Sequence, residues 1–401
     1  MTLKVLTIAS TFPSSTLPLH GVFVKERLRA VNELGQTDIR VISPVPYFPP
    51  IKAAKQWYVY SQIPHRESIA DLPVHRPRFI QPPKIGGYFQ SNLMFPVVQR
   101  AFKQLHDFQP DFIDSHFVYP DGVVATRLAK QLGIPVMITC RGEDILRFPS
   151  LPLVGNRIRW ALEHADRVVA LSDEIANAAI ANGAAPSRVV RIPNGVDTQS
   201  FKKVDQAGAR RELNLPLDRK IIVSVGNRQE RKGFHLLVDA MPEILRQHPD
   251  CILAIVGGPA RSGPDYGRII EERIIAHGLQ DKVVLVGATP HEELFRWYSA
   301  ADVFALMTSR EGSPNVLLEA LSCGVPAVAT AIGGIPEVLA DKRLGIVLDN
   351  RTSDDAAQGI CDALEKQWDR DQIREIMTEQ DWRATAKKVF SVFEALGRTT
   401  G

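Results

Sequence analysis

Short apolar runs alternate with amphipathic helical patterns from one end of the chain to the other. The apolar residues 4–8 predict a strand, residues 21–34 predict a helix, and residues 39–42 predict a second strand. A strand, a helix and a strand in this order imply two parallel neighbours in one sheet, joined by a right-handed crossover. The chain therefore opens as an α/β protein.

The same alternation continues as far as residue 171. Strands are predicted at 112–113, 136–138 and 168–171, and helices at 91–107 and 121–132. Residues 46–88 are different, because they are rich in proline and aromatic residues and follow neither the helical nor the strand period. We expect an irregular excursion there.

A second series of apolar runs starts at residue 221. Its predicted strands are 221–225, 251–256, 283–286 and 303–306. The two series meet near 198–218, where charged residues and glycine replace the periodic apolar positions. We predict two Rossmann-like α/β domains, residues 1–200 and residues 201–375. The helical pattern after them has no following strand, so a helix within 376–401 is expected to pack back on the first domain.

Ligands of open parallel sheets bind beyond the carboxyl ends of the strands. Both predicted domains have such an edge, and two edges facing each other would form one cleft. Residues 309–337, SREGSPNVLLEALSCGVPAVATAIGGIPE, follow one of the predicted strands. Ser313 is a good N-cap for a helix that runs to Cys323, and Gly324 would end this helix. The apolar residues 325–329 then predict another buried strand.

Two carboxylates and two turns lie close together in this stretch. Glu311 precedes the predicted helix, Glu319 lies on its second turn, and Gly333 with Gly334 opens a later turn. Backbone N–H groups at a helix start and in a glycine turn suit an anionic ligand such as a phosphate. The alternative is that both carboxylates are solvated and the glycines only make turns.

Composition narrows the class of protein. The chain has 401 residues, of which 45% are apolar and 23% charged, and a net charge of +3. These values are typical of a soluble globular protein and give no strongly basic surface for nucleic acid. No apolar run approaches the roughly 20 residues of a membrane span, and the N-terminus lacks a signal-peptide core. We expect a cytoplasmic protein, with peripheral attachment at the inner face of the membrane left open.

The cysteines support the same compartment. Their spacing contains no CxxC pair, so reduced core cysteines are expected rather than disulfides or a zinc site. They are Cys140, Cys251, Cys323 and Cys361.

Four segments together carry a resemblance to a known family. They are PNGVDTQSF at 193–201, VGNRQERKGFHLLVDA at 225–240, ADVFALMTSREGSPNVLLEALSCGVPAVAT at 301–330 and GGIPEV at 333–338. The chain resembles glycosyltransferase family 4, the retaining enzymes of GT-B fold that use nucleotide-sugar donors, and its Glu311 and Glu319 match the family's E-x7-E pair. The segments HGVFVKE at 20–26 and SHFVYPDG at 115–122 are most similar to those of members that build bacterial surface polysaccharides of the teichuronic-acid type.

The resemblance implies a donor site on the C-terminal domain and an acceptor site on the N-terminal domain, facing each other across the cleft. Glu319 would hold the ribose hydroxyls, and Glu311 would contact the hydroxyls of the donor sugar. The backbone that would meet the sugar and the diphosphate is that of Gly312, Ser313, Asn315 and Val316.

Three further positions match the family's site. Lys232 falls at the phosphate-binding lysine, where a cation would stabilise the charge that grows on the departing nucleoside diphosphate. The sequence departs from the family beside it, because Asn227 separates Gly226 from Arg228. Two alternatives therefore stand for Arg228: it binds the donor phosphate, or it takes no part in the donor site. His116 would contact the donor sugar near the transferred carbon, and the alternative is a structural histidine at a strand end.

The CRGED segment and the first loop supply the remaining candidates. Arg141 could pair with an acceptor or donor anion through two hydrogen bonds, or could brace its own loop together with Asp144. Gly21 would let the first loop approach the diphosphate closely, and its alternative is a plain turn before a helix.

The resemblance implies transfer of a hexose from a nucleoside diphosphate to a hydroxyl of a glycan or lipid-linked sugar, with retention. No carboxylate in the sequence is recognisable as the nucleophile of a double displacement. A front-face substitution, in which the leaving phosphate helps to deprotonate the acceptor, is therefore expected. No cofactor or metal is expected, since the Asp369-Arg370-Asp371 spacing lies in a charged helical segment. The alternatives are a GT-B epimerase and a non-catalytic protein that binds a nucleotide sugar or carbohydrate.

Contact with a membrane surface is a separate hypothesis. Aromatic and apolar residues at 56–60, 88–89 and 93–95 lie near basic residues and could form an interfacial patch. The alternative is that they belong to the core.

Overall fold

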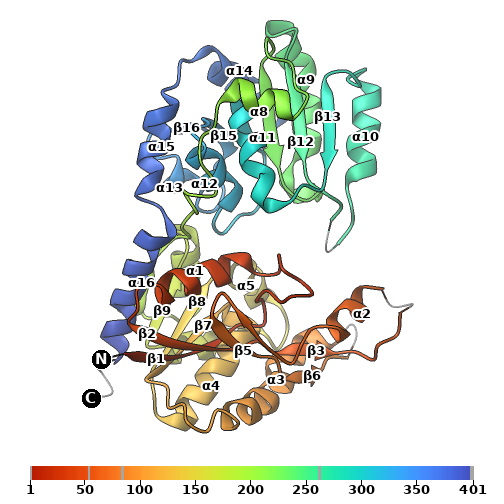
Figure 1. Ribbon diagram of the computed structural model, residues 1–401. Coiled ribbons are helices and arrows are strands. Elements are labelled where there is room, and N and C mark those ends of the chain that lie inside the picture. The colour runs from red at the N-terminus through yellow and green to blue at the C-terminus, as the bar shows by residue number, and fades with distance from the viewer. Residues whose placement is uncertain (1, 53–54, 83–84, 261–262, 398–401) are drawn as a thin grey trace. The chain divides into compact units, whose positions relative to one another are not determined.

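The chain divides into two compact units. The computed structural model describes residues 2–52, 55–82, 85–260 and 263–397, without the side chains of residues 55 and 56 (Figure 1). Unit 1 comprises the residues up to Asn194 together with the segment that begins at Trp382, and unit 2 is Gly195–Asp381. The junctions differ by six residues from 200 and 375, because the Val196 amide donates to the Gln380 carbonyl and so ties residue 196 to unit 2.

Unit 1 is built on an eight-stranded sheet in the order β10-β9-β8-β7-β1-β2-β5-β4. All neighbours pair in parallel except β4 and β5, which form an antiparallel hairpin. The strands are β1 (Leu3–Ile8), β2 (Thr37–Ile42), β4 (Arg66–Ile69), β5 (Leu72–His75), β7 (Phe112–His116), β8 (Val136–Cys140), β9 (Arg167–Ala170) and β10 (Val189–Arg191). The parallel centre of this sheet confirms the α/β prediction, whereas β10 was not predicted.

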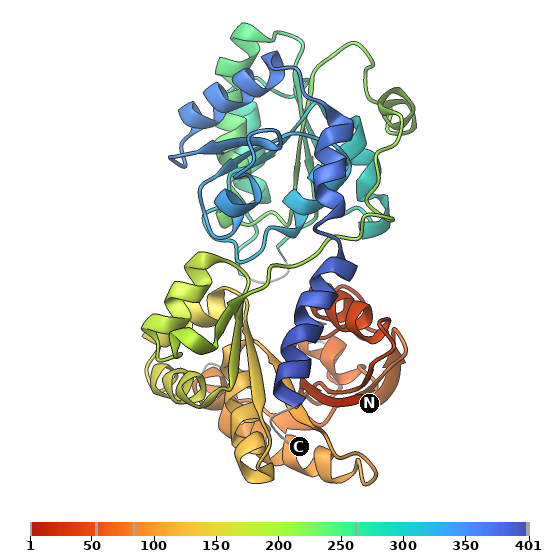
Figure 2. The ribbon, with the colours of Figure 1, turned by 90° about the vertical axis from the view of Figure 1, so that its left-hand side faces the viewer.

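Helices cover both faces of this sheet. They are α1 (Val22–Asn32), α2 (Lys55–Ser61), α3 (Gly86–Lys103), α4 (Val123–Leu132), α5 (Glu143–Leu146), α6 (Gly155–His164), α7 (Asp173–Ala181) and α16 (Trp382–Gly397). Helices α3, α4, α6 and α7 enclose one apolar core with the sheet, and α1 and α16 enclose the other. Figure 2 shows α16 beside α1, where Phe393 packs on Phe112 of β7 with ring centroids 4.8 Å apart. The predicted return of a C-terminal helix to the first domain is confirmed.

The excursion predicted to be irregular, 46–88, contains regular structure, so that prediction was wrong. Besides α2 and the β4–β5 hairpin, it holds part of β3 (Val45–Tyr47), which pairs in parallel with β6 (Arg78–Ile80) as a separate two-stranded sheet. Each of these strands has only three or four residues. A strand this short contains too few alternations for its period to stand out from the surrounding prolines.

Unit 2 contains a six-stranded, wholly parallel sheet in the order β13-β12-β11-β14-β15-β16. Its strands are β11 (Ile221–Val225), β12 (Ile252–Val256), β13 (Val283–Gly287), β14 (Val303–Leu306), β15 (Ala327–Thr330) and β16 (Gly345–Leu348). All but β16 were predicted. The strand order reverses between β11 and β14, which is where open sheets of this kind bind their ligands.

Two layers of helices sandwich the sheet of unit 2. The helices are α8 (Gln206–Glu212), α9 (Phe234–Gln247), α10 (Gly267–Ala276), α11 (Leu294–Ala300), α12 (Asn315–Ser322), α13 (Ile335–Val338), α14 (Ser353–Glu365) and α15 (Arg370–Thr378). Helices α9, α10 and α14 share one apolar core with the sheet, and α11, α12 and α15 share the other. The helical pattern predicted after the last strand is therefore two helices, α15 in unit 2 and α16 in unit 1.

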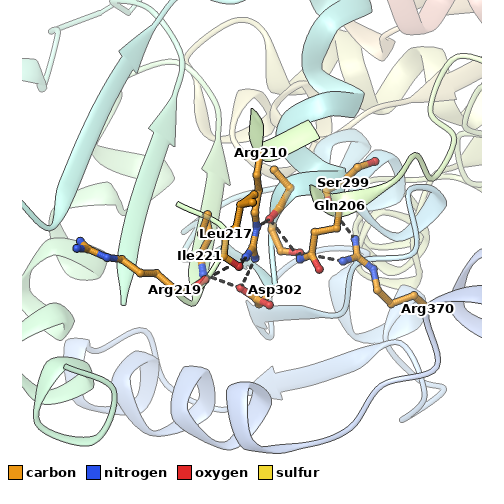
Figure 3. Close-up of polar contacts among 10 residues, drawn as sticks. Gln206, Arg210, Leu217, Arg219, Ile221, Ser299, Asp302 and Arg370 are labelled. Carbon is orange, nitrogen blue, oxygen red and sulfur yellow. Dashed lines mark hydrogen bonds and ion pairs between the residues drawn. The ribbon is translucent and has the colours of Figure 1, made fainter. Parts of the chain in front are cut away.

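A buried arginine attaches α8 to the rest of unit 2 (Figure 3). Arg210 donates to the carbonyl oxygens of Ala300, Leu217 and Arg219 at 2.9–3.1 Å, and its Nη2 lies 2.8 Å from Asp302 Oδ2. The same Asp302 oxygen accepts from the amide of Ile221, the first residue of β11. Hydrogen bonds thus replace apolar periodicity in this segment, which is why the sequence showed only a junction there.

Two further observations concern membrane-spanning helices and the cysteines. Within the described ranges, no helix is both long and apolar enough to cross a membrane. The four cysteines are free and buried, as predicted.

Candidate functional site

The helix after β14 starts and ends in ways that position Glu311 and Glu319. Helix α12 begins at Asn315 and its N-cap is Pro314, whose side chain cannot cap, so the predicted N-cap at Ser313 was wrong by one residue. The predicted end is confirmed, because the amides of Gly324 and Val325 donate back to the carbonyls of Leu321 and Ala320 as in a Schellman motif.

Glu311 forms an ion pair with Lys232 in unit 2. Lys232 closes the 3-10 turn Glu230–Lys232 after β11, and its Nζ donates to Glu311 Oε1. Both side chains are largely buried, with 10% and 14% of their surface exposed. The carboxyl ends of β11 and β14, adjacent where the strand order reverses, thus bring together the two charged residues that the sequence predicted for this site.

A glycine holds the backbone of Glu311 in place. Gly333 has a φ of +58°, and a Cβ atom on it would lie 1.6 Å from the carbonyl oxygen of Glu311. Any larger residue would force the two segments apart. The glycine turn after β15 is therefore in backbone contact with the loop after β14, as its place in the sequence suggested.

Glu319, on the second turn of α12, is buried, and each of its carboxylate oxygens has one partner. Tyr298 of α11 donates from its hydroxyl to Oε2 at 2.8 Å, and Nε2 of His291 lies 2.9 Å from Oε1. Burial raises the pKa of Tyr298 well above its usual value, with the Glu319 carboxylate adding to the shift. The phenol therefore stays protonated and donates, so the carboxylate is fixed in orientation and keeps further lone pairs for a ligand.

Sequence reasoning missed Tyr298 and His291. They precede Glu319 by 21 and 28 residues, so no helical or strand period relates them to it. Tyr298 also fills an apolar core position against Phe304, with ring centroids 5.7 Å apart. In the sequence it is indistinguishable from any aromatic residue that packs a helix on a sheet.

Other predicted donor-site residues lie on the same edge. Gly312, Ser313, Asn315 and Val316 are half-buried at the start of α12, where the first turn of a helix leaves amide groups without partners inside the helix. Arg228 follows β11 but faces Asp265 and Glu271, at 3.7 and 4.0 Å. Its guanidinium thus lies beside Asp265 of the β12–α10 loop and Glu271 of α10.

In unit 1, His116 lies in a buried polar cluster at the end of β7. Its Nδ1 accepts from Arg141 Nη2 at 2.8 Å, so the ring proton is on Nε2, which lies 3.1 Å from Asp114 Oδ2. Burial lowers the pKa of His116 to about 4, although the Asp114 carboxylate opposes the shift. The ring is fully buried and neutral, with both nitrogens facing groups of unit 1.

Arg141 and Asp144 brace the loop after β8. The Oδ1 atom of Asp144 accepts from the amides of Arg141 and Gly142, and its Oδ2 accepts from the amide of Val118 at 2.7 Å. Besides His116, the Arg141 guanidinium contacts Asn194 at 3.3 Å. These contacts fit the alternative in which Arg141 and Asp144 brace their own loop.

Gly21 caps α1 and touches the loop after β1. Its φ is +80°, and a Cβ atom would lie 2.4 Å from the Thr11 carbonyl oxygen. The glycine is therefore required by the protein's own backbone.

Comparison with known proteins identifies the family. Residues 205–380 match the family model "Glycosyl transferases group 1", and residues 58–200 match the model "Glycosyltransferase Family 4". TuaC of Bacillus subtilis, named as a teichuronic acid biosynthesis glycosyltransferase, is 29% identical over 339 residues, which are 83% of this chain and 82% of TuaC. The chain is a glycosyltransferase.

Solved structures establish the fold of this glycosyltransferase as GT-B. Sucrose-phosphate synthase from Thermosynechococcus elongatus superposes with a TM-score of 0.79 at 24% identity, covering 99% of this chain and all of the other. HepE of Anabaena, in complex with UDP, gives a TM-score of 0.75 at 18% identity over 98% of this chain and all of HepE.

The glycosyltransferase has no cluster of three metal-ligating side chains within its described residues. The two aspartates of the Asp369-Arg370-Asp371 spacing have separate roles. Asp369 caps α15 by accepting from the amides of Asp371 and Gln372, and Asp371 forms an ion pair with Lys203 at 2.5 Å. Both aspartates are exposed and have these structural partners.

The buried His116 predicts how the stability of the glycosyltransferase depends on pH. The unfolded chain protonates this imidazole near pH 6.5, whereas the folded chain resists protonation down to about pH 4. Because the unfolded state binds more protons in this window, we expect the free energy of unfolding to fall by about 2 kcal/mol from pH 6.5 to 5 on account of His116.

Urea unfolding of the wild type and His116→Gln, at pH 6.5 and pH 5, isolates this contribution. Burial raises the pKa of Asp121 to about 7, which changes stability in the opposite direction over the same range, but this contribution cancels in the difference between the two proteins. A difference that is the same at both pH values would contradict the neutral buried imidazole.

Proposed function

We propose that the protein transfers a hexose from a nucleoside diphosphate sugar to a hydroxyl of a glycan or lipid-linked sugar, in the synthesis of a bacterial surface polysaccharide. The observation that carries the proposal is the buried Lys232–Glu311 pair, which lies at the strand-order reversal of unit 2 with Glu319 eight residues further on. The similarity to TuaC supports the pathway, and the family favours transfer over the epimerase and the non-catalytic binding protein.

The charges of this site suit the departing nucleoside diphosphate. Lys232 already donates to Glu311, so a bound diphosphate would share its ammonium group and take up the cation where negative charge develops. Glu319 would accept from the two ribose hydroxyls with lone pairs that Tyr298 and His291 leave available. Glu311 would then contact a sugar hydroxyl.

Removing the Tyr298 hydroxyl tests the seating of Glu319. We expect Tyr298→Phe to raise the KM for the donor about two- to tenfold with little change in kcat, since one hydrogen bond contributes about 0.5–1.5 kcal/mol. Steady-state kinetics with saturating acceptor measure both constants. Tyr119→Phe removes a hydroxyl that donates to the Gly87 carbonyl in unit 1, and should leave the donor KM unchanged. Equal KM values for wild type and Tyr298→Phe would refute the orienting role.

The stereochemical part of the proposal is retention by front-face substitution. The acceptor hydroxyl attacks on the side from which the diphosphate leaves, and a phosphate oxygen takes its proton. A double displacement would instead need a carboxylate nucleophile close to the anomeric carbon. Intact-protein mass spectrometry during turnover should detect no glycosylated side chain, and a trapped glycosyl adduct would overturn this step.

We further propose that no metal ion takes part. Lys232 and the start of α12 supply the positive potential that a divalent cation would otherwise provide. Turnover in excess EDTA is therefore expected to equal turnover without it. Loss of activity that returns on addition of Mg²⁺ would show that the proposal is wrong.

Contact with a membrane surface is the last part of the proposal. The interfacial patch predicted from the sequence is partly core, since Met94 and Phe95 are buried, and the Gln56 side chain lies outside the described residues. Exposed apolar side chains lie beside it. Tyr47 and Ile80 are cross-strand partners in β3 and β6, and Ile85 and Phe89 mark the start of α3; all four are more than 40% exposed. Co-sedimentation with anionic vesicles should fall in Ile80→Ser, and wild-type protein that stays in the supernatant at low salt would refute the contact.

The proposed function is tested by release of nucleoside diphosphate from UDP-, GDP-, dTDP- and ADP-sugars. HepE was solved with UDP, so UDP-glucose leads the panel. One donor should be hydrolysed slowly in the absence of acceptor and faster with it, and Glu319→Ala should lose both rates. A protein that turns over none of the four donors would contradict the proposal.

A further inference from the structure

An arginine from a third loop of unit 2 reaches the two loops that carry the Lys232–Glu311 pair. Arg351 lies between β16 and α14. Its Nε donates to the carbonyl oxygen of Met307 at 2.9 Å, and its Nη2 donates to the carbonyl oxygen of Glu230 at 3.0 Å. One guanidinium thus forms a bridge between the loop after β14 and the turn after β11.

The two carbonyl groups of this bridge lie close in sequence to the ion pair. Glu230 opens the 3-10 turn that Lys232 closes, and Met307 precedes Glu311 by four residues. The ammonium group of Lys232 donates to Glu311 Oε1. Arg351 therefore bonds to the backbone segments that carry both partners of the pair.

The turn after β11 is attached to the loop after β14 at a second point. The amide of Ser309 donates to the Arg231 carbonyl at 2.8 Å. A segment that is attached at one point only can still pivot about it. Because Arg351 adds an attachment at Glu230, the two points together define the orientation of the turn and hence the direction in which Lys232 leaves it.

The end of the turn touches the same carbonyl group that Arg351 binds. Gly233, the residue after Lys232, has a φ of +74°, and a Cβ atom on it would lie 2.0 Å from the carbonyl oxygen of Met307. The two backbones are therefore in direct contact beside the lysine. A shift of the Met307 carbonyl would displace the turn as well.

An arginine is suited to such a bridge. Its guanidinium holds five N–H groups in one rigid plane, so it can serve two acceptors at a fixed separation. The side chain of Arg351 is 24% exposed, and the next residue, Thr352, caps α14 by accepting from the Asp355 amide. The exposed Glu230 carboxylate, 3.7 Å from Nη1, adds little. The two bonds to carbonyl groups are therefore the main part of the bridge.

We propose that Arg351 is a positioning residue for Lys232. It holds the turn after β11 against the end of β14 and so fixes where the ammonium group meets the departing diphosphate. Rates depend steeply on such placement, since a displacement of about 1 Å can cost about 10²-fold. The effect on turnover rests on the proposed function. The bridge itself rests on contacts within unit 2 alone.

A double-mutant cycle tests whether Arg351 acts through Lys232. Arg351→Met keeps an apolar stem and removes both bonds, and it should lower kcat for donor turnover about tenfold. In the Lys232→Met background the same change should alter kcat by less than about twofold, because the group that it positions is already absent. A tenfold loss in both backgrounds, or no loss in either, would overturn the proposal.

Arg351→Lys separates the bridge from the charge. Lysine keeps the positive charge but lacks the rigid fork, so its activity should stay within about threefold of Arg351→Met. Wild-type activity in Arg351→Lys would contradict the bridge. Arg343→Met is the control for the loss of one arginine. Arg343 is more than half exposed and pairs with Asp341 of its own loop, so kcat should stay within about twofold of the wild type.

Hydrogen exchange measures the bridge without any turnover. Within the turn, the amides of Lys232 and Gly233 donate to the carbonyls of Gln229 and Glu230 at 3.0 Å. In Arg351→Met these amides should exchange about two- to tenfold faster, as expected when one hydrogen bond that holds the turn is lost. The amides of β12 should keep their wild-type rates. Unchanged exchange in the turn, or equally faster exchange throughout unit 2, would refute the bridge.

Hydrogen exchange and donor hydrolysis, measured on the same proteins, keep the two proposals apart. If the turn exchanges faster in Arg351→Met but the wild type hydrolyses no donor, the proposed function fails and the bridge stands. If the wild type hydrolyses a donor but exchange in the turn is unchanged, the bridge fails alone.

Discussion

Replacing Lys232 by methionine should lower kcat/KM for transfer by about 10²–10³-fold, the range found when one preorganised charge-stabilising group is removed. The ammonium group has no substitute on its own turn, because the neighbouring Arg231 keeps its guanidinium 3.9 Å from Glu311 and more exposed. The stem of methionine still fills the space beside Gly226, where the Lys232 methylenes pack. The fold should therefore persist while the charge is lost, although the Glu311 carboxylate, left without Lys232, lowers its stability. Release of nucleoside diphosphate under steady-state conditions measures the effect.

Lys203→Met is the matched control for this change. Lys203 also lies in unit 2 and forms an ion pair, with the exposed Asp371. Its removal should leave activity within about twofold, as expected for an exposed pair. If Lys232→Met retained more than a third of the activity, the lysine would have no part in leaving-group stabilisation.

Replacing Arg210 by methionine should destabilise unit 2 by about 3 kcal/mol, the low end of the cost of removing one partner of a buried ion pair, because Asp302 keeps 21% of its side chain exposed. Its guanidinium donates to three backbone carbonyls and pairs with Asp302 (Figure 3). Without it, these acceptors lose their donors at a position where the arginine side chain is buried. Urea unfolding followed by circular dichroism should report the loss.

Arg211→Met, one residue further along α8, provides the comparison. Arg211 is exposed, so this variant should lie within about 0.5 kcal/mol of the wild type. Equal stability of the two variants would mean that the Arg210 network does not hold α8 to the sheet.

The parts of the fold that depend on apolar periodicity were predictable. Strands such as β12 are continuous apolar runs because both faces of a parallel sheet are covered. The three-residue strands β3, β6 and β10 have no such signal, since their pairing is decided by neighbours far away in sequence. Helix α8 likewise depends on Arg210 and backbone carbonyls, which hydropathy does not register.

The candidate site was predictable as far as it is local in sequence. Glu311 and Glu319 flank the start of one helix, so their spacing alone places them on one edge, and Lys232 followed from the resemblance. The partners of Glu319 could not be found this way, because Tyr298 reaches it from another helix through the tertiary fold. The neutral, buried state of His116 was equally hidden, since it depends on Arg141 and Asp114 closing around the ring.

The most direct measurement is calorimetric titration of UDP, GDP, dTDP and ADP into the wild type and Glu319→Ala, with Lys203→Met as a control. We predict that one nucleoside diphosphate binds the wild type and the control equally, and binds Glu319→Ala at least tenfold more weakly, because the ribose loses a charged acceptor. Equal affinity for wild type and Glu319→Ala would contradict it, since the nucleotide would then bind away from α12.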